Sequence, residues 1–526
     1  MTSVGSSASS AVDSTTVDYT LHFAPPETFA AARACLERAQ YEESVVARRL
    51  GRETLFDFAR LCDGRATLAG DAEDANAALI RLLLDGEPLD QARAEQLCGA
   101  PGITALRELG VLVPDPHDSS KLVASVLLTP TRGVWVAQDM PPRRAGSAPT
   151  SSQSMARDVV FPAVTELTGQ FLRTLEFAPG TRVVELCAGT GVAALMAARR
   201  GASEAWATDI TERSVYFERW NAALNGFANV HAVHSDAWDA LEGETFDRVY
   251  AHPPYVPALT HVYDYRDAGE DGEHVSRRIV QGLPAHLRDG GRATITCALT
   301  DRSGAPIEQR IREWLGDASP EFDLVLLQRR EWDAMHAFRS ATRQKESVAG
   351  VEAWLEHFQR LGIERFVLCT FELRRDAAGR PPITIRRRAA AQLDAAAVDY
   401  ACRWARYVIK GESSADRLGD QQPRVVPGTQ LRTGWRADAS GDWQGVGASV
   451  VADYPVTAAV DLPPGGPELL QLCDGTRDLR ALHRELQEAG AIGADVTPGN
   501  VADLLELLLS IGALEVPACP VPPRPS

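Results

Sequence analysis

A glycine turn and an acidic residue downstream of it are the first residues in this chain that could do chemistry. Residues 185–191 read Glu-Leu-Cys-Ala-Gly-Thr-Gly, and Gly189 and Gly191 let the backbone turn tightly and approach a ligand. Asp209 follows Gly189 by 20 positions (209 − 189). A carboxylate at this spacing suits a ribose, because it can accept hydrogen bonds from both hydroxyls. The pattern predicts a site for a nucleoside-containing ligand.

Three regular elements must position these residues. Arg182–Leu186 is a short apolar run with β-branched residues, typical of a buried parallel strand. Val192–Arg200 is an Ala-rich helix that Gly201 ends, and Ala205–Ile210 is the next strand. This order of strand, turn, helix and strand predicts an α/β fold. The alternative interpretation of the site is an α/β turn that binds no ligand.

Two nucleotide ligands fit such a turn, a dinucleotide or S-adenosylmethionine (SAM). A dinucleotide favours three glycines, so that its pyrophosphate can sit on the helix N-terminus. Here Cys187 occupies the first glycine position, and Glu185 stands just before it. An acid beside the turn repels phosphate but attracts the ammonium and sulfonium groups of SAM. The sequence therefore favours SAM over NAD.

Two further predicted strands end in polar residues. Residues 229–234 lead to Asp236 and Ala237, and Phe246–Ala251 runs into His252-Pro253-Pro254-Tyr255. At this point residues 155–390 resemble the class I SAM methyltransferases. They look closest to the HemK-type branch, the release-factor glutamine N-methyltransferases, and to ribosomal and tRNA amino-methyltransferases. In that family a motif of Asn, Asp or Ser followed by Pro-Pro-Tyr or Pro-Pro-Phe closes this strand.

The resemblance implies a Rossmann-like, seven-stranded sheet, SAM as cofactor, and in-line methyl transfer without a metal. The prolines fix the backbone, so that a carbonyl and a side-chain acceptor face the substrate nitrogen, while the ring stacks on a planar group. The residues expected to bind the cofactor are Glu185, Cys187, Ala188, Gly189, Thr190, Gly191, Asp209, Ile210, Asp236, Ala237 and His252. Those expected to act in catalysis are His252, Pro253, Pro254 and Tyr255.

His252 departs from the family motif. A neutral histidine can accept one hydrogen bond, and it can act as a base near neutral pH. His252 is therefore compatible with N-methylation, but it weakens the prediction that the substrate is a release-factor glutamine. It also makes O-methylation an alternative. A structural histidine that caps a loop is the alternative. Upstream, Pro162, Thr165 and Glu166 faintly resemble a segment that lines the SAM site in HemK-type enzymes.

Length and composition limit the number of domains, the partners and the cellular location that can be predicted. The chain has 526 residues, enough for two to four domains, and a net charge of −17, which disfavours nucleic acid as a partner. Nine cysteines are scattered singly without a Cys-x-x-Cys pair, so no zinc site is predicted and a reducing cytoplasm fits. The Ser-rich residues 1–16 predict a disordered start and no signal peptide, and no run is long enough to span a membrane.

The predicted domains are residues 17–145, 155–390 and 391–520, with a linker at 141–154. The first domain is expected to be helical and winged-helix-like, and the last to end in a similar unit, most simply a packing or dimerisation module. Phe366–Arg374 and Ile383–Arg388 are expected to form the antiparallel hairpin that closes the sheet. Residues 410–460 show little periodicity, which indicates irregular structure.

The sequence thus predicts a cytoplasmic methyltransferase that acts on an amide or amino nitrogen of a protein or peptide. The polar loop 256–273 is expected to cover the substrate. A small natural product or RNA, methylated on nitrogen or oxygen, is the alternative acceptor class. A non-catalytic SAM-binding regulator is a further alternative, and a homodimer is left open.

Overall fold

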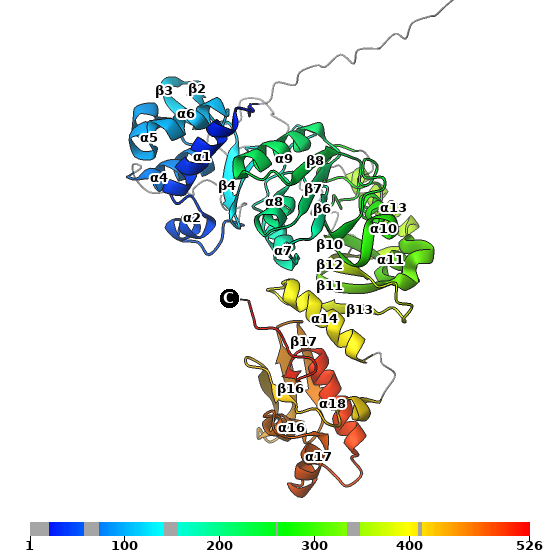
Figure 1. Cartoon of the computed structure of the whole chain (residues 1–526). Helices are drawn as coiled ribbons and strands as arrows, with labels where there is room; N and C mark the ends of the chain where they lie inside the picture. Colours follow the sequence, from blue (N-terminus) through cyan, green and yellow to red (C-terminus); the bar gives the residue numbers. More distant parts are fainter. Residues whose placement is uncertain are drawn as a thin grey trace, which may run out of the picture.

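The computed structural model describes residues 20–56, 73–140, 156–258, 261–333, 348–408 and 413–525. The predicted disordered start at residues 1–16, the linker 141–154 and one of the nine cysteines, Cys62, therefore lie outside the described residues. Three parts follow one another along the chain, with a large central sheet between a mainly helical N-terminal part and a smaller C-terminal part (Figure 1). None of the described helices is long and apolar enough to cross a membrane.

The centre of the molecule is an eight-stranded mixed sheet in the order β13-β11-β12-β10-β9-β6-β7-β8. The fold class predicted seven strands and the sheet has eight, among them the expected strand at Ile383–Arg388, which is β13. The six strands from β8 to β12 in this order are β8 (Val230–His234), β7 (Glu204–Asp209), β6 (Arg182–Leu186), β9 (Phe246–Ala251), β10 (Leu287–Arg302) and β12 (Ile363–Arg375). The strands from β8 to β10 are parallel, whereas β12 is antiparallel to β10. The α/β class of the prediction is confirmed.

The predicted hairpin between Phe366–Arg374 and Ile383–Arg388 is wrong. Strand β12 has both edges occupied, because it lies between β10 and the antiparallel strand β11 (Phe322–Asp333). Strand β13 (Thr384–Arg388) therefore pairs with the outer edge of β11, in parallel, with Leu324 opposite Thr384. The loop around Gly379 joins two strands that are not neighbours.

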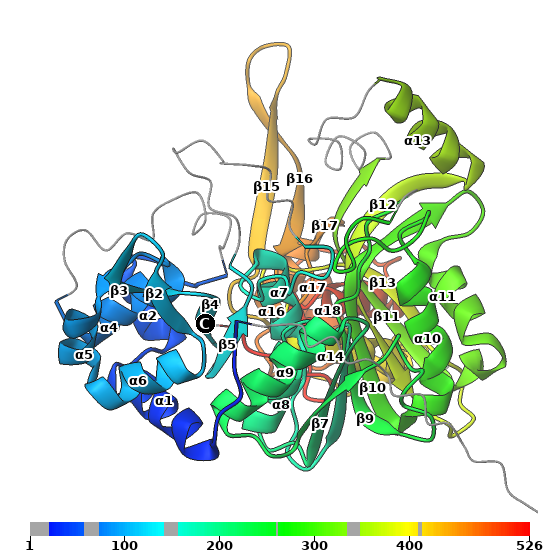
Figure 2. The same ribbon diagram turned by 90° about the horizontal axis from the view of Figure 1, so that it is seen from above.

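Helices connect the parallel strands and cover the sheet (Figure 2). Helix α8 (Val192–Arg199) links β6 to β7, and α9 (Glu212–Asn225) links β7 to β8. Almost all of α8 is buried, as its run of alanines, Leu195 and Met196 allows. Strand order reverses beside β6, because the chain continues to β7 on one side and returns as β9 on the other. The carboxyl ends of parallel strands next to such a reversal are the usual place for a ligand.

The N-terminal part packs against α9. Its elements are α1 (Pro26–Arg38), α2 (Glu43–Arg49), α4 (Ala75–Leu79), η1 (Ile80–Leu84), β1 (Leu89–Asp90), α5 (Gln91–Cys98), α6 (Ala100–Glu108), β2 (Leu112–Asp115), β3 (Asp118–Ala124), β4 (Leu127–Thr131) and β5 (Val134–Gln138). The backbone N–H groups of Trp135 and Ala137 in β5 donate to the side chains of Asn225 and Asn221 at 2.9 and 2.8 Å. Trp220 of α9 is fully buried in the same core.

The C-terminal part contains regular structure that the sequence did not predict. Its elements are α14 (Ala395–Val408), α15 (Ser414–Leu418), β14 (Arg424–Val425), β15 (Gln430–Ala437), β16 (Trp443–Ala452), β17 (Ala458–Leu462), α16 (Gly466–Leu472), α17 (Leu479–Glu488), α18 (Pro498–Ser510) and β18 (Leu514–Glu515). Strands β15, β16 and β17 form an antiparallel sheet within the segment expected to be irregular. Residues 430–437 alternate between polar and apolar types, a pattern that indicates a strand, although every residue of β15 is exposed.

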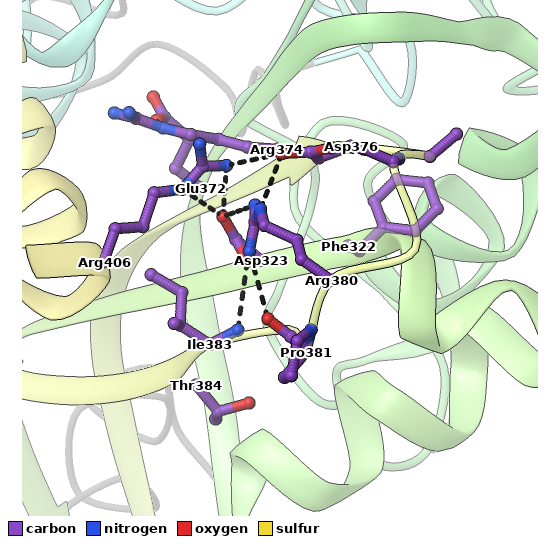
Figure 3. Close-up of polar contacts among 12 residues, drawn as sticks. Phe322, Asp323, Glu372, Arg374, Asp376, Arg380, Pro381, Ile383, Thr384 and Arg406 are labelled. Carbon is purple, nitrogen blue, oxygen red and sulfur yellow. Dashed lines mark hydrogen bonds and ion pairs between the residues drawn. The ribbon is translucent and has the colours of Figure 1, made fainter. Parts of the chain in front are cut away.

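A buried carboxylate joins the central sheet to the C-terminal part (Figure 3). Asp323 of β11 has a fully buried side chain and pairs with Arg380 at 2.6 Å and with Arg406 of α14. Its carboxylate also accepts a hydrogen bond from the Ile383 backbone N–H at 3.0 Å. Burial alone raises the pKa of Asp323, but these hydrogen bonds and charges outweigh it and the pKa is lowered. Asp323 is thus held ionised between two guanidinium groups.

Removing this charge should loosen the joint between the two parts. We expect Asp323→Asn to lower the free energy of unfolding by about 2 kcal/mol, because the partly exposed Arg380 and Arg406 lose their buried partner and keep only Asp376. Because the native pKa is depressed, the contribution of Asp323 exists above its unfolded pKa and is lost as the pH falls through the native pKa. Thermal melts of both proteins at pH 7 and near pH 3 measure this, with Glu331→Gln, at a half-exposed ion pair with Arg365, as the control. Equal melting temperatures at pH 7 would contradict the assignment.

Candidate active site

A cavity of about 800 Å³ lies at the carboxyl ends of β6, β7, β8 and β9. It contains both segments singled out in the sequence. The predicted site residues that line it are Glu185, Cys187, Ala188, Gly189, Thr190, Asp209, Ile210, Asp236, Ala237, His252, Pro253, Pro254 and Tyr255. Gly191 does not line the cavity. The tertiary structure therefore brings the two sequence segments to one place.

The glycine turn adopts the conformation that its glycines allow. Cys187, Gly189 and Gly191 all have positive φ angles, of 54°, 56° and 75°. A side chain at Gly189 would meet no atom within 4 Å, so its backbone faces open space. A Cβ at Gly191 would lie 3.2 Å from the Glu218 side chain, so Gly191 allows α9 to pack closely beneath the turn.

Asp209 is fixed by hydrogen bonds at both carboxylate oxygens. Its Oδ2 accepts the Gly189 N–H at 2.9 Å, and its Oδ1 accepts the Thr211 N–H at 3.0 Å. Burial raises the pKa of Asp209. The half-buried carboxylate lines the cavity. Its Oδ2 can accept a further bond, and so can Oδ1 when the Thr211 hydroxyl donates to Ser214, at 2.7 Å, instead of to Asp209, at 3.1 Å. Asp209 therefore presents acceptors to the cavity, and its role toward a ribose stays a prediction.

Two buried acids lie near Asp209 beneath the turn. Glu185 is 4% exposed and accepts the Ala194 N–H at 2.8 Å, and burial raises its pKa to about 8. Glu218 of α9 is 1% exposed, and neither of its carboxylate oxygens has a hydrogen-bond partner. Burial raises the pKa of Glu218 well above its ordinary value, and Asp209 and Glu185 raise it further. Sequence reasoning missed Glu218, because an acid inside a helix is usually solvated.

Asp236 lies at the rim of the cavity with a cation beside it. Its Oδ2 accepts from Arg278 at 2.6 Å, and its side chain is 48% exposed. The adjacent Ala237 has a positive φ of 51°, which turns the backbone here. Arg278 belongs to α10 (His274–His286), so this helix orients the carboxylate.

The segment from His252 to Tyr255 forms the opposite wall. The His252 ring lies 5.5 Å from the Phe171 ring and 6.2 Å from the Tyr255 ring, measured between centroids. Burial lowers the pKa of His252 to about 4 and raises that of Tyr255 to about 12. His252 is therefore neutral at pH 7 and a poor base there. This pKa disfavours a base near neutral pH and the O-methylation that such a base would serve, and the role of His252 stays a prediction.

Two segments close over the cavity from opposite sides. Phe161 stacks on Tyr265 with ring centroids 4.7 Å apart, and the Arg157 guanidinium pairs with Asp264 at 3.0 Å. Pro162 and Thr165 line the cavity, whereas Glu166 lies outside it in the first turn of α7 (Glu166–Thr174). The predicted covering loop 256–273 is described except for residues 259–260, and it supplies this second wall.

Residues 164–316 match the family model of the methyltransferase small domain, so this segment is similar to that domain. The HemK-like resemblance of this segment is thereby confirmed.

Several known proteins with similar sequences are named as glutamine methyltransferases. A release factor glutamine methyltransferase of Xylella fastidiosa is 34% identical over 137 residues, which are 24% of this chain and 50% of the relative. One of Cereibacter sphaeroides is 32% identical over 126 residues, which are 22% and 45%. A ribosomal protein uL3 glutamine methyltransferase of Bradyrhizobium diazoefficiens is 29% identical over 164 residues, which are 28% and 46%. The chain spans about half the length of these relatives.

The ligand-free protein should become less stable as the pH rises. The folded pKa of Glu185 is near 8 against 4.5 ordinarily, so between these values the folded state holds a proton that the unfolded state has lost. The free energy of unfolding therefore falls across this window, by at most about 5 kcal/mol from this group. We expect a lower melting temperature at pH 8 than at pH 5.5, and a smaller difference in Glu185→Gln. The exposed Glu166→Gln is the control, and an unchanged difference in Glu185→Gln would refute the linkage.

Proposed function

We propose that this chain is a SAM-dependent methyltransferase that methylates an amide or amino nitrogen of a protein or peptide. One observation carries the proposal: a single cavity joins the glycine turn, Asp209 and the segment from His252 to Tyr255. The first two suit a nucleoside with a cationic amino acid part, and the third suits a planar nitrogen group.

The residues of the cavity fit SAM. The open space at Gly189 admits a ligand against the backbone, and Asp209 presents acceptors for the ribose hydroxyls. The acids Glu185 and Glu218 near the turn hold their protons at pH 7 because burial raises their pKa values, and a cationic ligand would favour their ionised forms, which suits ammonium and sulfonium and disfavours pyrophosphate. Asp236 and Ala237 line the part of the cavity proposed for adenine.

SAM supplies an electrophilic methyl group when it is bound. The neutral imidazole of His252 has one unprotonated nitrogen, which can accept a hydrogen bond from the substrate N–H. Among the described residues none hydrogen-bonds this ring, and burial is the one cause of its pKa shift, so a role in capping a loop is disfavoured. Pro253 and Pro254 restrict the backbone between the imidazole and the Tyr255 ring. These side chains orient the acceptor nitrogen, and positioning of this kind lowers the barrier to transfer.

A protein acceptor is supported by the relatives. Their names state glutamine methylation of a release factor and of ribosomal protein uL3. A hydroxyl acceptor needs a base, and the neutral His252 is a poor base at pH 7. Nitrogen is therefore favoured over oxygen as the methylated atom. We further propose three functional units at 17–145, 155–390 and 391–520 in the cytoplasm. The described cysteines are free thiols, which agrees with a reducing compartment.

We also propose that both flanking units are winged-helix-like. In the N-terminal unit, the order β1, α5, α6, β2, β3 with a β1-β3-β2 sheet supports this. In the C-terminal unit, three helices are followed by β18, which pairs with β14 in a two-stranded sheet. Whether two chains associate stays a prediction of the sequence.

Loss of the ribose acceptor should abolish cofactor binding. We expect Asp209→Ala to weaken SAM binding at least about 100-fold, because two hydrogen bonds to a charged group are lost in a buried site. Titration calorimetry with SAM, and with NAD as the competing ligand, measures this. The exposed Asp239→Ala, at the end of the Arg278 pair, is the control. Wild-type protein that binds NAD and ignores SAM would overturn the proposed function.

His252 should affect turnover and leave cofactor binding intact. We expect His252→Ala to bind SAM normally and to lose about 100-fold or more in methyl transfer, because the acceptor nitrogen is no longer oriented. His252→Asn restores the residue of the family motif and should retain activity. Transfer of radiolabelled methyl from SAM to proteins of a cell extract measures all three enzymes. Normal turnover of His252→Ala would place the acceptor site elsewhere.

A further inference from the structure

Two strands of the C-terminal part project from the body of the molecule as an arm (Figure 2). Strands β15 and β16 pair antiparallel from Gln430 opposite Val451 to Ala437 opposite Trp443. The third strand, β17, pairs only with residues 448–452 of β16. The outer part of the arm is therefore a two-stranded ribbon.

One face of the arm is apolar and exposed. Residues directly opposite one another in an antiparallel pair share a face, and Trp435 lies opposite Gly445 as Ala437 lies opposite Trp443. Leu431, Trp435 and Trp443 consequently lie on the same face, and they are 45, 61 and 70% exposed. Val446, in the bulge of β16, is 53% exposed and lies over Gly434 on the opposite face. The other face carries polar residues: Gln430, Arg432, Arg436 and Gln444.

We propose that the apolar face of this arm packs against the same face of a second copy of the chain. A two-stranded ribbon is at best marginally stable in water, so an apolar face on it calls for a permanent cover. A second copy is available wherever the chain is present. A face that pairs with itself also gives the two-fold symmetry of most homodimers.

The area of the face just reaches that of a specific contact. An aromatic side chain offers about 150–250 Å² for burial, so the exposed parts of the two tryptophans supply roughly 250 Å² per arm. With Leu431 and the small exposed residues between them, two arms bury at most about 1,000 Å² in total. This value lies below the usual range of about 1,200–2,000 Å² and at the limit of about 1,000 Å² that a specific interface should reach.

Charge also favours contact at the arm. The chain carries a net charge of −17, so two copies repel each other over most of their surfaces. Residues 430–451 hold two arginines, Arg432 and Arg436, and two aspartates, Asp438 and Asp442, and are therefore neutral overall. The two copies can meet here without bringing net negative charges together.

Sedimentation equilibrium of the full chain over about 1 to 100 µM tests the proposal. We expect wild-type protein to have twice the chain mass of 56.9 kDa, and Trp435→Ser with Trp443→Ser to weaken association at least about 100-fold. Leu507→Ser, at an exposed apolar residue of α18, is the control and should remain dimeric. A monomeric wild type, or a dimer that survives the double substitution, overturns the proposal.

A second pair of variants guards against an arm that fails to fold without its tryptophans. Thr433→Glu places a carboxylate on the apolar face, since Thr433 lies opposite Ala448 between Leu431 and Trp435. Gln430→Glu makes the same change in charge on the polar face. We expect the first to dissociate the dimer and the second to leave it intact. Equal behaviour of these two variants rules out packing through the apolar face.

Discussion

The parallel pairing of β6 with a strand on each side is the constraint on which the candidate site depends. Leu186 lies opposite Thr208 of β7 and opposite Ala251 of β9, so three strands end at the same level. The chain leaves β6 toward one side and returns on the other, and the cavity lies at the carboxyl ends beside this reversal. The glycine turn, Asp209 and His252 each follow one of these ends or lie at it. Their proximity is a property of the sheet order and holds whatever the acceptor is.

Two acids at and beneath the cavity are poorly accessible to water. Glu185 and Glu218 are almost fully buried, and their pKa values are raised by burial. Such a site favours a ligand that carries positive charge, because the cation offsets the unfavourable burial of the carboxylates. Binding of a cationic ligand and loss of protons are consequently linked in this fold. This balance explains physically why the turn suits a sulfonium cofactor better than a pyrophosphate.

The two flanking parts attach to elements that also shape the site. Helix α9 turns Trp220 and Asn225 toward the N-terminal part and Glu218 toward the glycine turn. On the far side of the sheet, Asp323 connects β11 to α14 through Arg406. The apolar core around Val325 continues into the C-terminal part. The flanking parts are therefore packed extensions of the central sheet, and changes in their contacts can reach the elements beneath the cavity.

The sequence by itself determined the strand-turn-helix unit, the place of Asp209 at the end of the next strand and the segment from His252 to Tyr255. These features depend on residues close together in the chain, whose spacing reflects local backbone geometry. The tertiary structure alone decided the partner of β13, the burial of Glu218, the neutral state of His252 and the projecting arm. Each of these depends on which distant residues exclude water or occupy a strand edge. Burial and edge pairing depend on the whole fold and cannot be deduced from a local sequence pattern.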